Sequence, residues 1–326
     1  MRYIVTGGAG FIGSHLVEML SKEGHDVLVI DNFSSGKLEN IPNDVPRICW
    51  ELDELSDSYF TDIGILENAG NGKFDGVFHL AADARIQPTI KDPRHAVLAN
   101  IVATMNILEI MRYAKIPNIV YSASSSTYGL KNKSPLREDM HPDCLNPYAV
   151  TKYAGEQLCQ TWGKCYGIGN VSLKYFNVYG ERSPVQLGKY SPVIGLFFKQ
   201  ALRDNKNLTV VGDGNQKRDF TYVSDVARAN ILAMQNLEGS GKANGHTINI
   251  GTGTNHTIND IAKKVCDLVK PIRPKIKVSH VSPRPAEARE TLADNSKAKQ
   301  LLGWEPTVGL DEALQKLLPY YQEQFA

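Results

Sequence analysis

Tyr148 and Lys152 lie four residues apart, a spacing that places both side chains on one face of the chain if the segment is helical. A free tyrosine has a pKa of about 10, whereas a catalytic base works best near ambient pH. Lowering the pKa to about 7 requires roughly 4 kcal/mol, of which a lysine charge about 7 Å away supplies roughly 2 kcal/mol. A second positive charge, such as an oxidised nicotinamide ring, must supply the rest. A solvated helix face can carry the same pair, so the surrounding sequence has to decide.

The N-terminal segment is predicted to bind a dinucleotide. An apolar run over 3–5 precedes the glycine-rich turn 6–13, and apolar residues at helical spacing follow over 14–21. This strand, turn and helix would offer backbone amides to a pyrophosphate. A second apolar run over 27–30 ends in Asp31, whose carboxylate would bind an adenosine ribose and repel a 2'-phosphate. The sequence therefore favours NAD over NADP, unless Asp31 is only a turn residue.

The first half of the chain predicts an α/β fold with a doubly wound parallel sheet, similar to a Rossmann fold. Strand candidates over 76–80 and 118–122 alternate with a helix candidate over 93–113. Ligands of such sheets bind at the carboxyl ends of the strands. There, the segment 79–82 has small residues that would admit a flat ring, and the hydroxyl-rich loop 123–129 offers a third catalytic residue. Loop hydroxyls more often cap turns.

The second half predicts a smaller, mixed α/β substrate-binding lobe. Short strand candidates over 209–211 and 247–250 lie among helix candidates over 223–234 and 258–268. We expect an NAD-binding domain over residues 1–176, to which later segments at about 220–255 return. Residues 177–326 would form mainly the substrate lobe.

Composition excludes several classes of protein. The 326 residues are 42% hydrophobic and 22% charged, and a net charge of +1 gives no field for nucleic acid or an anionic membrane. The five cysteines and eight histidines show no metal-ligand or disulfide spacing. No signal peptide or long apolar stretch is apparent. We expect a cytoplasmic protein that binds no metal, nucleic acid or membrane.

Several motifs occur in an order that resembles the extended short-chain dehydrogenase/reductase family, in its nucleotide-sugar epimerase and dehydratase branch. They are TGGAGFIG, HLAA, the serine loop before Tyr-Gly, Tyr-x-x-x-Lys, KYFNVYG, GDG with RDF, and LGWEP. The resemblance covers the whole chain. It implies that Ser124, Tyr148 and Lys152 form the catalytic triad and that Phe176 lies beside the nicotinamide.

The resemblance also implies which residues bind NAD. They are Gly7, Gly10, Phe11, Ile12, Gly13, Asp31, Asn32, Ser35, Gly36, Leu80, Ala81, Ala82, Asn100, Tyr148, Lys152 and Phe176. The chain departs from the family at the adenine end, where Leu52-Asp53-Glu54-Leu55 replaces Gly-Asp-apolar. We expect Glu54 and Leu55 to lie there, with Asp53 as an alternative acidic residue.

The residues after Ser124 indicate the reaction. Dehydratases of the family carry Asp-Glu where this chain has Ser125-Ser126, and decarboxylases typically keep the Glu. Its absence favours hydride transfer without elimination, as in a 4-epimerase with tightly bound NAD. UDP-glucuronate 4-epimerase, a decarboxylase and a non-catalytic NAD-binding sensor remain alternatives.

The resemblance places the substrate diphosphate on Arg218 and Arg284, a chemistry that suits bidentate guanidinium groups. The alternative for both arginines is surface ion pairing. Arg289 is expected to be a surface charge. Further substrate contacts implied by the resemblance are Ser124, Asn177, Val193, Val210 and, on the uridine ribose, Glu287.

Thr291 falls where glucose-restricted epimerases resemble one another in having a bulky Tyr near the sugar 2-substituent. A threonine leaves room for an N-acetyl group, so we expect activity on UDP-N-acetylglucosamine as well as UDP-glucose. The resemblance further implies a homodimer formed by the helix after Asp92 and the helix that carries Tyr148.

Overall fold

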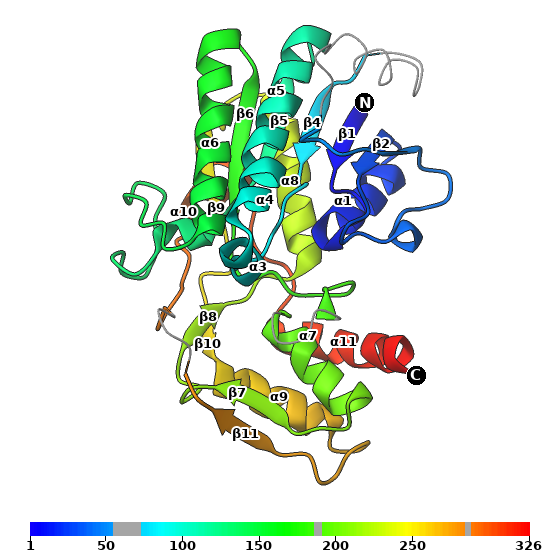
Figure 1. The fold of residues 1–326 in the computed structure, drawn as a ribbon, viewed down its shortest axis with the longest axis vertical. Coiled ribbons are helices and arrows are strands. Elements are labelled where there is room, and N and C mark those ends of the chain that lie inside the picture. Colours follow the sequence, from blue (N-terminus) through cyan, green and yellow to red (C-terminus); the bar gives the residue numbers. More distant parts are fainter. Residues whose placement is uncertain (55–72, 186–190, 284–287) are drawn as a thin grey trace.

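The computed structural model describes residues 1–54, 73–185, 191–283 and 288–326, arranged as a larger and a smaller lobe (Figure 1). The larger lobe is built on a seven-stranded sheet in the order β3-β2-β1-β4-β5-β6-β9. All neighbouring strands in it are parallel. The strands are β1 (Arg2–Thr6), β2 (Asp26–Asp31), β3 (Arg47–Cys49), β4 (Gly76–His79), β5 (Asn118–Ser124), β6 (Gly169–Tyr175) and β9 (His246–Ile250).

Helices cover both faces of this sheet, which confirms the predicted doubly wound α/β fold. One face packs against α1 (Phe11–Lys22), α8 (Val223–Glu238) and α10 (Ser296–Leu302), and the other against α5 (Ala103–Ala114) and α6 (Pro147–Tyr166). Side chains alternate between the two cores as in any strand. Tyr3 and Val5 of β1 belong to the first core, and Ile4 belongs to the second.

The helix predicted over 93–113 is interrupted by a wider turn. It consists of α4 (Pro93–Val97), the π-helical segment η2 (Leu98–Val102) and α5, after the short helix α3 (Ile86–Lys91). By length and composition the stretch 93–114 could cross a membrane, but half of its most apolar window is buried inside the protein. Core helices pass the same test. The π-helical turn matters for the site because it turns Asn100 into the protein, where its exposure is 1%.

The smaller lobe contains two small sheets and three longer helical segments. β7 (Leu208–Val211) pairs with β11 (Val278–Val281) in parallel, and β8 (Lys217–Asp219) pairs with β10 (Asn255–Thr257) in antiparallel. The helices are α7 (Val193–Phe198) with η5 (Lys199–Arg203), α9 (Ile258–Val269) and α11 (Leu310–Phe325). Their apolar faces enclose a separate core. The carboxyl ends of the large sheet point towards this lobe (Figure 1).

Candidate active site

The helix α6 presents Tyr148 and Lys152 to the sheet. Asn146 caps the helix by accepting from the Ala149 amide over 3.0 Å, and Pro147 occupies the first turn, where a missing N–H costs nothing. Lys152 is only 3% exposed, and its ammonium donates to the Ser122 carbonyl oxygen over 2.8 Å. The ammonium is thus buried against β5, and the solvated helix face is excluded for Lys152.

Burial changes the acid–base properties of both side chains. Desolvation lowers the pKa of Lys152 from its ordinary value of 10.5 to about 8. Burial raises the pKa of Tyr148, whereas a hydrogen bond with Ser124 acts in the opposite direction. Ser124, the last residue of β5, is 7% exposed, and its hydroxyl lies 2.9 Å from that of Ser126. The structure therefore brings the three predicted catalytic residues together between β5 and α6.

The glycine-rich turn after β1 forms a tight backbone cradle. Gly7 has a φ of +69°, and a Cβ there would lie 2.7 Å from the Ala81 amide nitrogen. A Cβ at Gly13 would lie 2.1 Å from the Gly7 carbonyl oxygen. Only glycine allows the turn, the helix α1 and the loop after β4 to approach so closely. The predicted residues Gly10, Phe11 and Ile12 start α1 at this turn, so its first amides face outward from a helix N-terminus, as a pyrophosphate requires.

Asp31 connects the turn with the loop after β2. Its carboxylate accepts from the Ala9 amide over 2.9 Å and from the Phe33 amide over 2.8 Å. Burial raises the pKa of Asp31, and the two amide bonds act against that rise. The predicted Ser35 is exposed, and a Cβ at Gly36 would lie 2.7 Å from the Ala9 side chain. These residues can hold NAD, because Asp31 can bind its adenosine ribose and the glycine cradle can bind its pyrophosphate.

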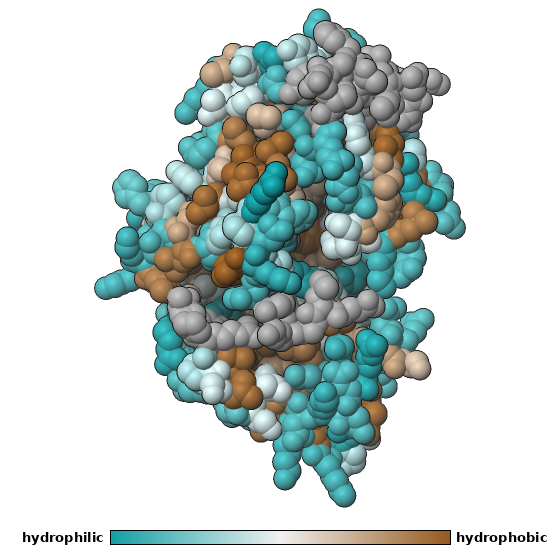
Figure 2. All heavy atoms as spheres, viewed as in Figure 1, coloured by the Kyte–Doolittle hydropathy of each residue, from teal (hydrophilic) through white to brown (hydrophobic). Residues whose placement is uncertain are grey.

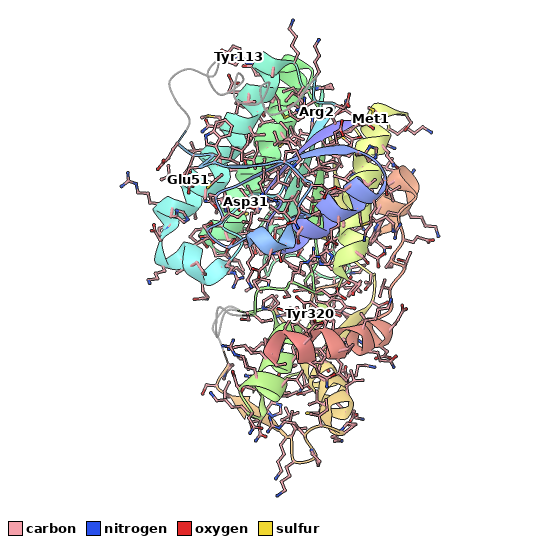
Figure 3. All side chains as sticks on the ribbon, turned by 90° about the vertical axis from the view of Figure 1, so that its right-hand side faces the viewer. Met1, Arg2, Asp31, Glu51, Tyr113 and Tyr320 are labelled. Carbon is pink, nitrogen blue, oxygen red and sulfur yellow. The ribbon has the colours of Figure 1, made fainter. Side chains whose placement is uncertain are left out.

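The sequence analysis did not single out Glu51, which lies beside the predicted cofactor residues Asp31 and Asn32. Its carboxylate accepts from the predicted Asn32 over 2.9 Å, and Figure 3 shows Glu51 and Asp31 at the same end of the sheet. Glu54 is exposed, Asp53 is partly exposed, and Leu55 lies outside the described residues. Glu51 follows β3, a strand that the sequence analysis did not predict. The rule that ligands bind after strands would have found it.

The residues predicted to lie near the nicotinamide differ in their exposure. Leu80, Ala81 and Ala82 are partly exposed at the end of β4. Asn100 is buried, and its amide donates to Thr151 over 2.9 Å. The place of Phe176 beside the nicotinamide stays a prediction. Its exposure is 0%, and it packs with the Tyr128 ring at 6.2 Å, in a cluster that also contains Leu136 and Ala293, because the chain from β6 turns into the core there.

Asn177 and Thr291 meet at the junction of the lobes, although 114 residues separate them. The Asn177 amide donates to the Thr291 hydroxyl over 3.3 Å and to the Asp219 carbonyl oxygen over 2.8 Å. Asp219 is fully buried, and its carboxylate accepts from the Thr252, Gly253 and Ala293 amides. One carboxylate thereby joins β8, the loop after β9 and the segment around Thr291.

A cavity of about 710 Å³ lies on the smaller lobe. Val211, Gly212, Asp213, Gln216, His280, Val281, Ser282, Pro283, Ala288 and Arg289 line it. The substrate contact predicted for Val210 stays a prediction. Its exposure is 0% within the core of the lobe, because side chains alternate along β7, and its neighbour Val211 faces the cavity. Arg289, predicted to be a surface charge, pairs with Asp213 over 3.0 Å and is 73% exposed.

The remaining predicted substrate residues divide into two groups. Val193 is partly exposed at the start of α7, and Arg218 is partly exposed on β8, where it donates to the Lys217 carbonyl oxygen over 2.8 Å. Arg284 and Glu287 lie outside the described residues. Their roles at the diphosphate and ribose stay predictions.

Comparison with a protein-family model matches residues 4–317, and the model is described as GDP-mannose 4,6 dehydratase. The match spans both lobes, including the cradle, α6 and the segment around Thr291. The similarity therefore extends over the whole predicted site.

Three solved structures are similar over nearly the entire chain. UDP-glucose 4-epimerase of Thermotoga maritima, solved with UDP-glucose, is 32% identical with a TM-score of 0.89, covering 100% of both chains. UDP-N-acetylglucosamine 4-epimerase of Methanobrevibacter ruminantium, solved with UDP-N-acetylmuramic acid, is 31% identical with a TM-score of 0.88, covering 99% of this chain and 98% of the other. UDP-glucuronic acid 4-epimerase of Bacillus cereus, solved with UDP-glucuronic acid and NAD, is 32% identical with a TM-score of 0.85, covering 99% and 100%.

Proposed function

Since the chain belongs to the GDP-mannose 4,6 dehydratase family and is an extended short-chain dehydrogenase/reductase of the NAD-dependent nucleotide-sugar epimerase type, we propose that it interconverts UDP-hexoses at carbon 4. The observation that carries this proposal is the convergence of Ser124, Tyr148 and the buried Lys152 beside the end of β5. The proposed substrates are UDP-glucose and UDP-galactose, with UDP-N-acetylglucosamine also accepted.

The three residues divide the acid–base work. Tyr148, as a phenolate, removes the proton of the sugar 4-hydroxyl, and later returns it to the same oxygen. Ser124 donates a hydrogen bond to the reacting oxygen and keeps the phenol oriented. Lys152 stabilises the phenolate with its charge. The glycine cradle at Gly7 and the Asp31 carboxylate would hold NAD, which would supply the acceptor and donor of the carbon 4 hydride.

The residues after Ser124 favour epimerisation over elimination or decarboxylation. The hydroxyl of Ser126 lies 2.9 Å from the hydroxyl of Ser124. Ser126 stands at the position where dehydratases and decarboxylases of the family resemble one another in carrying a Glu. A neutral serine hydroxyl is a much weaker base than a glutamate carboxylate, so Ser126 cannot supply the additional base that removal of water requires. This supports hydride transfer as the whole reaction.

We further propose that Thr291 lies near the sugar 2-substituent. It contacts Asn177, which lies two residues after the end of β6 at the carboxyl end of the sheet. A threonine there occupies less volume than a tyrosine and would leave space for an N-acetyl group. UDP-glucuronate is the second candidate substrate, because the Bacillus cereus neighbour was solved with UDP-glucuronic acid.

The decisive experiment incubates the purified protein with UDP-glucose, UDP-N-acetylglucosamine and UDP-glucuronate separately and resolves the products by NMR. The proposal expects 4-epimers of the first two, and no reaction with Tyr148→Phe. Release of carbon dioxide and a UDP-pentose from UDP-glucuronate would show that the protein is a decarboxylase and not a 4-epimerase. If the protein binds NAD but forms no product from any of the three UDP-sugars, the result would favour a non-catalytic NAD-binding sensor.

We also propose a cytoplasmic homodimer. The structure carries exposed apolar side chains on the helices α4 to α6, including Val97, Val150, Tyr113 and Tyr166, whose exposures are 43–51%. Apolar side chains gather over α5 and α6 in Figure 2. Light scattering gives the molar mass of the wild type and of Val150→Asp in solution. The wild type should have the mass of a dimer and the variant that of a monomer.

The cysteines are free, which agrees with a reducing compartment such as the cytoplasm.

A further inference from the structure

His79, the last residue of β4, takes no part in the mechanism above, yet it lies at the centre of the site's supporting structure. Its exposure is 0%. Its two ring nitrogens contact two threonines, with Nδ1 2.7 Å from the Thr6 hydroxyl and Nε2 2.9 Å from the Thr104 hydroxyl. The imidazole therefore bridges β1, at the start of the glycine cradle, and α5, directly after the π-helical turn.

The surrounding hydrogen bonds determine which nitrogen carries the proton. The Thr104 hydroxyl donates its single proton to the Asn100 carbonyl oxygen over 2.6 Å, so it accepts from Nε2 of His79. The Thr6 hydroxyl accepts from the Ala81 amide over 3.3 Å, and it can donate its proton to Nδ1. In this arrangement every donor has an acceptor. The arrangement requires a neutral imidazole protonated on Nε2.

The two ends of this hydrogen-bonded chain lie at the predicted cofactor and catalytic elements. At one end is Ala81, beside the cradle at Gly7. At the other end is Asn100, whose side chain bonds to the backbone of Asp83 over 2.7 and 3.1 Å and to the Thr151 hydroxyl over 2.9 Å. Thr151 precedes Lys152. Because Asn100 bonds to Thr151, a displacement of the Asn100 turn would shift this part of α6.

His79 also contacts the surroundings of Lys152 through Tyr121. The two rings stack with centroids 5.9 Å apart and planes at 29°. The Lys152 ammonium lies 5.3 Å from the centroid of the Tyr121 ring. Burial and the charge of Lys152 lower the pKa of His79 to about 3, which agrees with the neutral form required by the hydrogen bonds.

We propose that His79 is a positioning residue for the catalytic helix: as an imidazole protonated on Nε2, it holds the Asn100 turn and the Tyr121 ring in the places that orient Lys152. The alternative is a core histidine that contributes only to the stability of the fold. The proposal rests on the proposed epimerase function, because its kinetic effects are effects on that reaction.

Variants at Thr104 separate positioning from stability. Thr104→Val removes the acceptor for Nε2 and the donor to Asn100 while preserving the shape of the side chain. We expect kcat to fall about tenfold, the size of effect that about 1.4 kcal/mol on a barrier produces, with KM for the UDP-sugar unchanged. Thr104→Ser restores the hydroxyl and should restore kcat. Thr89→Val, at a fully buried threonine on α3, is the matched control and should leave kcat unchanged.

Two results would overturn the proposal. One is a wild-type kcat for Thr104→Val, and the other is an equal loss for Thr104→Val and Thr104→Ser. His79→Gln, which can keep a donor near the Nε2 position, offers a second variant and should retain more kcat than His79→Asn, which can keep only a group near the Nδ1 position.

NMR of the ¹⁵N-labelled ring tests the proton arrangement without any assay. We expect one Nε2-protonated tautomer that does not change between pH 5 and 9, and the same spectrum type when NAD is bound. An Nδ1-protonated ring, or a titration near pH 6.5, would contradict the positioning role. If the protein lacks epimerase activity, this spectrum still decides the structural part, so the two failures are distinguishable.

Discussion

The Lys152 ammonium donates to the Ser122 carbonyl oxygen over 2.8 Å in a site where the lysine is only 3% exposed. A neutral carbonyl does not compensate for burying a charge, so the protonated form of Lys152 destabilises the fold. The lowering of its pKa from 10.5 to about 8 corresponds to about 3 kcal/mol. The fold is therefore destabilised by the same buried ammonium whose charge the proposed mechanism needs.

We expect Lys152→Met to abolish activity and to change the pH dependence of stability. Below pH 8 the lysine is protonated in the folded and unfolded chains, and the destabilisation is complete. Between pH 8 and 10.5 the folded chain loses the proton first, so wild type gains stability relative to the variant. The difference in the free energy of unfolding between the two should shift by about 3 kcal/mol over this range, as measured by urea denaturation.

Lys174→Met is the control for this experiment. Lys174 is also buried, but its ammonium lies 3.6 Å from the Glu156 carboxylate, at 5% side-chain exposure for both. Removing it leaves a buried carboxylate without its partner, so this variant should lose about 3 kcal/mol or more at pH 7. A destabilised Lys152→Met with a flat pH difference would contradict the prediction for Lys152.

The hydrogen bond with Ser124 is expected to set the pH at which Tyr148 becomes active. Burial raises the pKa of Tyr148 and the Ser124 bond lowers it. A phenolate base makes the rate rise with pH through this pKa, so Ser124→Ala should move the rising limb of kcat/KM to higher pH and lower kcat about 10²-fold. Ser124→Thr keeps a hydroxyl and serves as the control. In a direct titration of Tyr148, its pKa should be higher with NADH bound than with NAD bound, because NADH lacks the positive charge of the nicotinamide. Identical titrations would remove the nicotinamide charge from the mechanism.

Local patterns in the sequence predicted several strands of the large sheet. The strands β1, β2, β4 and β5, which the sequence analysis placed within a residue or two, are short apolar runs bounded by turns. The family and NAD dependence are also supported by the comparisons. These features depend on residues close in sequence, where spacing alone carries the information.

Features that depend on distant contacts were missed. The burial of Val210 and Phe176 follows from how the lobe cores close, and no local spacing reports it. The Asn100 turn is π-helical, although its sequence reads as a continuous helix. His79 belonged to a recognised motif, but its role depends on partners 73 and 25 residues away. Periodicity contains no information about such pairs.

Asp31→Asn is expected to weaken the discrimination between NAD and NADP. The variant removes the negative charge that would repel a 2'-phosphate, while its remaining oxygen can still accept from the Ala9 or Phe33 amide. We expect NAD to bind about tenfold more weakly and the preference over NADP to fall by one to two orders of magnitude, roughly 1.4–2.8 kcal/mol. Isothermal titration calorimetry with both cofactors measures the change. Glu51→Gln is the comparison, and unchanged selectivity in Asp31→Asn would reassign the ribose site to Glu51.

Thr291 offers a test of sugar selectivity that separates size from hydrogen bonding. Its hydroxyl accepts from Asn177 over 3.3 Å at the junction of the lobes. Thr291→Tyr should reduce kcat/KM for UDP-N-acetylglucosamine about 10²-fold or more and leave UDP-glucose within a few-fold, because a ring would fill the space for the N-acetyl group. Thr291→Val keeps the volume without the hydroxyl and should retain both substrates. If the tyrosine variant loses both sugars equally, Thr291 does not line the 2-position, and the N-acetyl selectivity must be sought among other residues near Asn177.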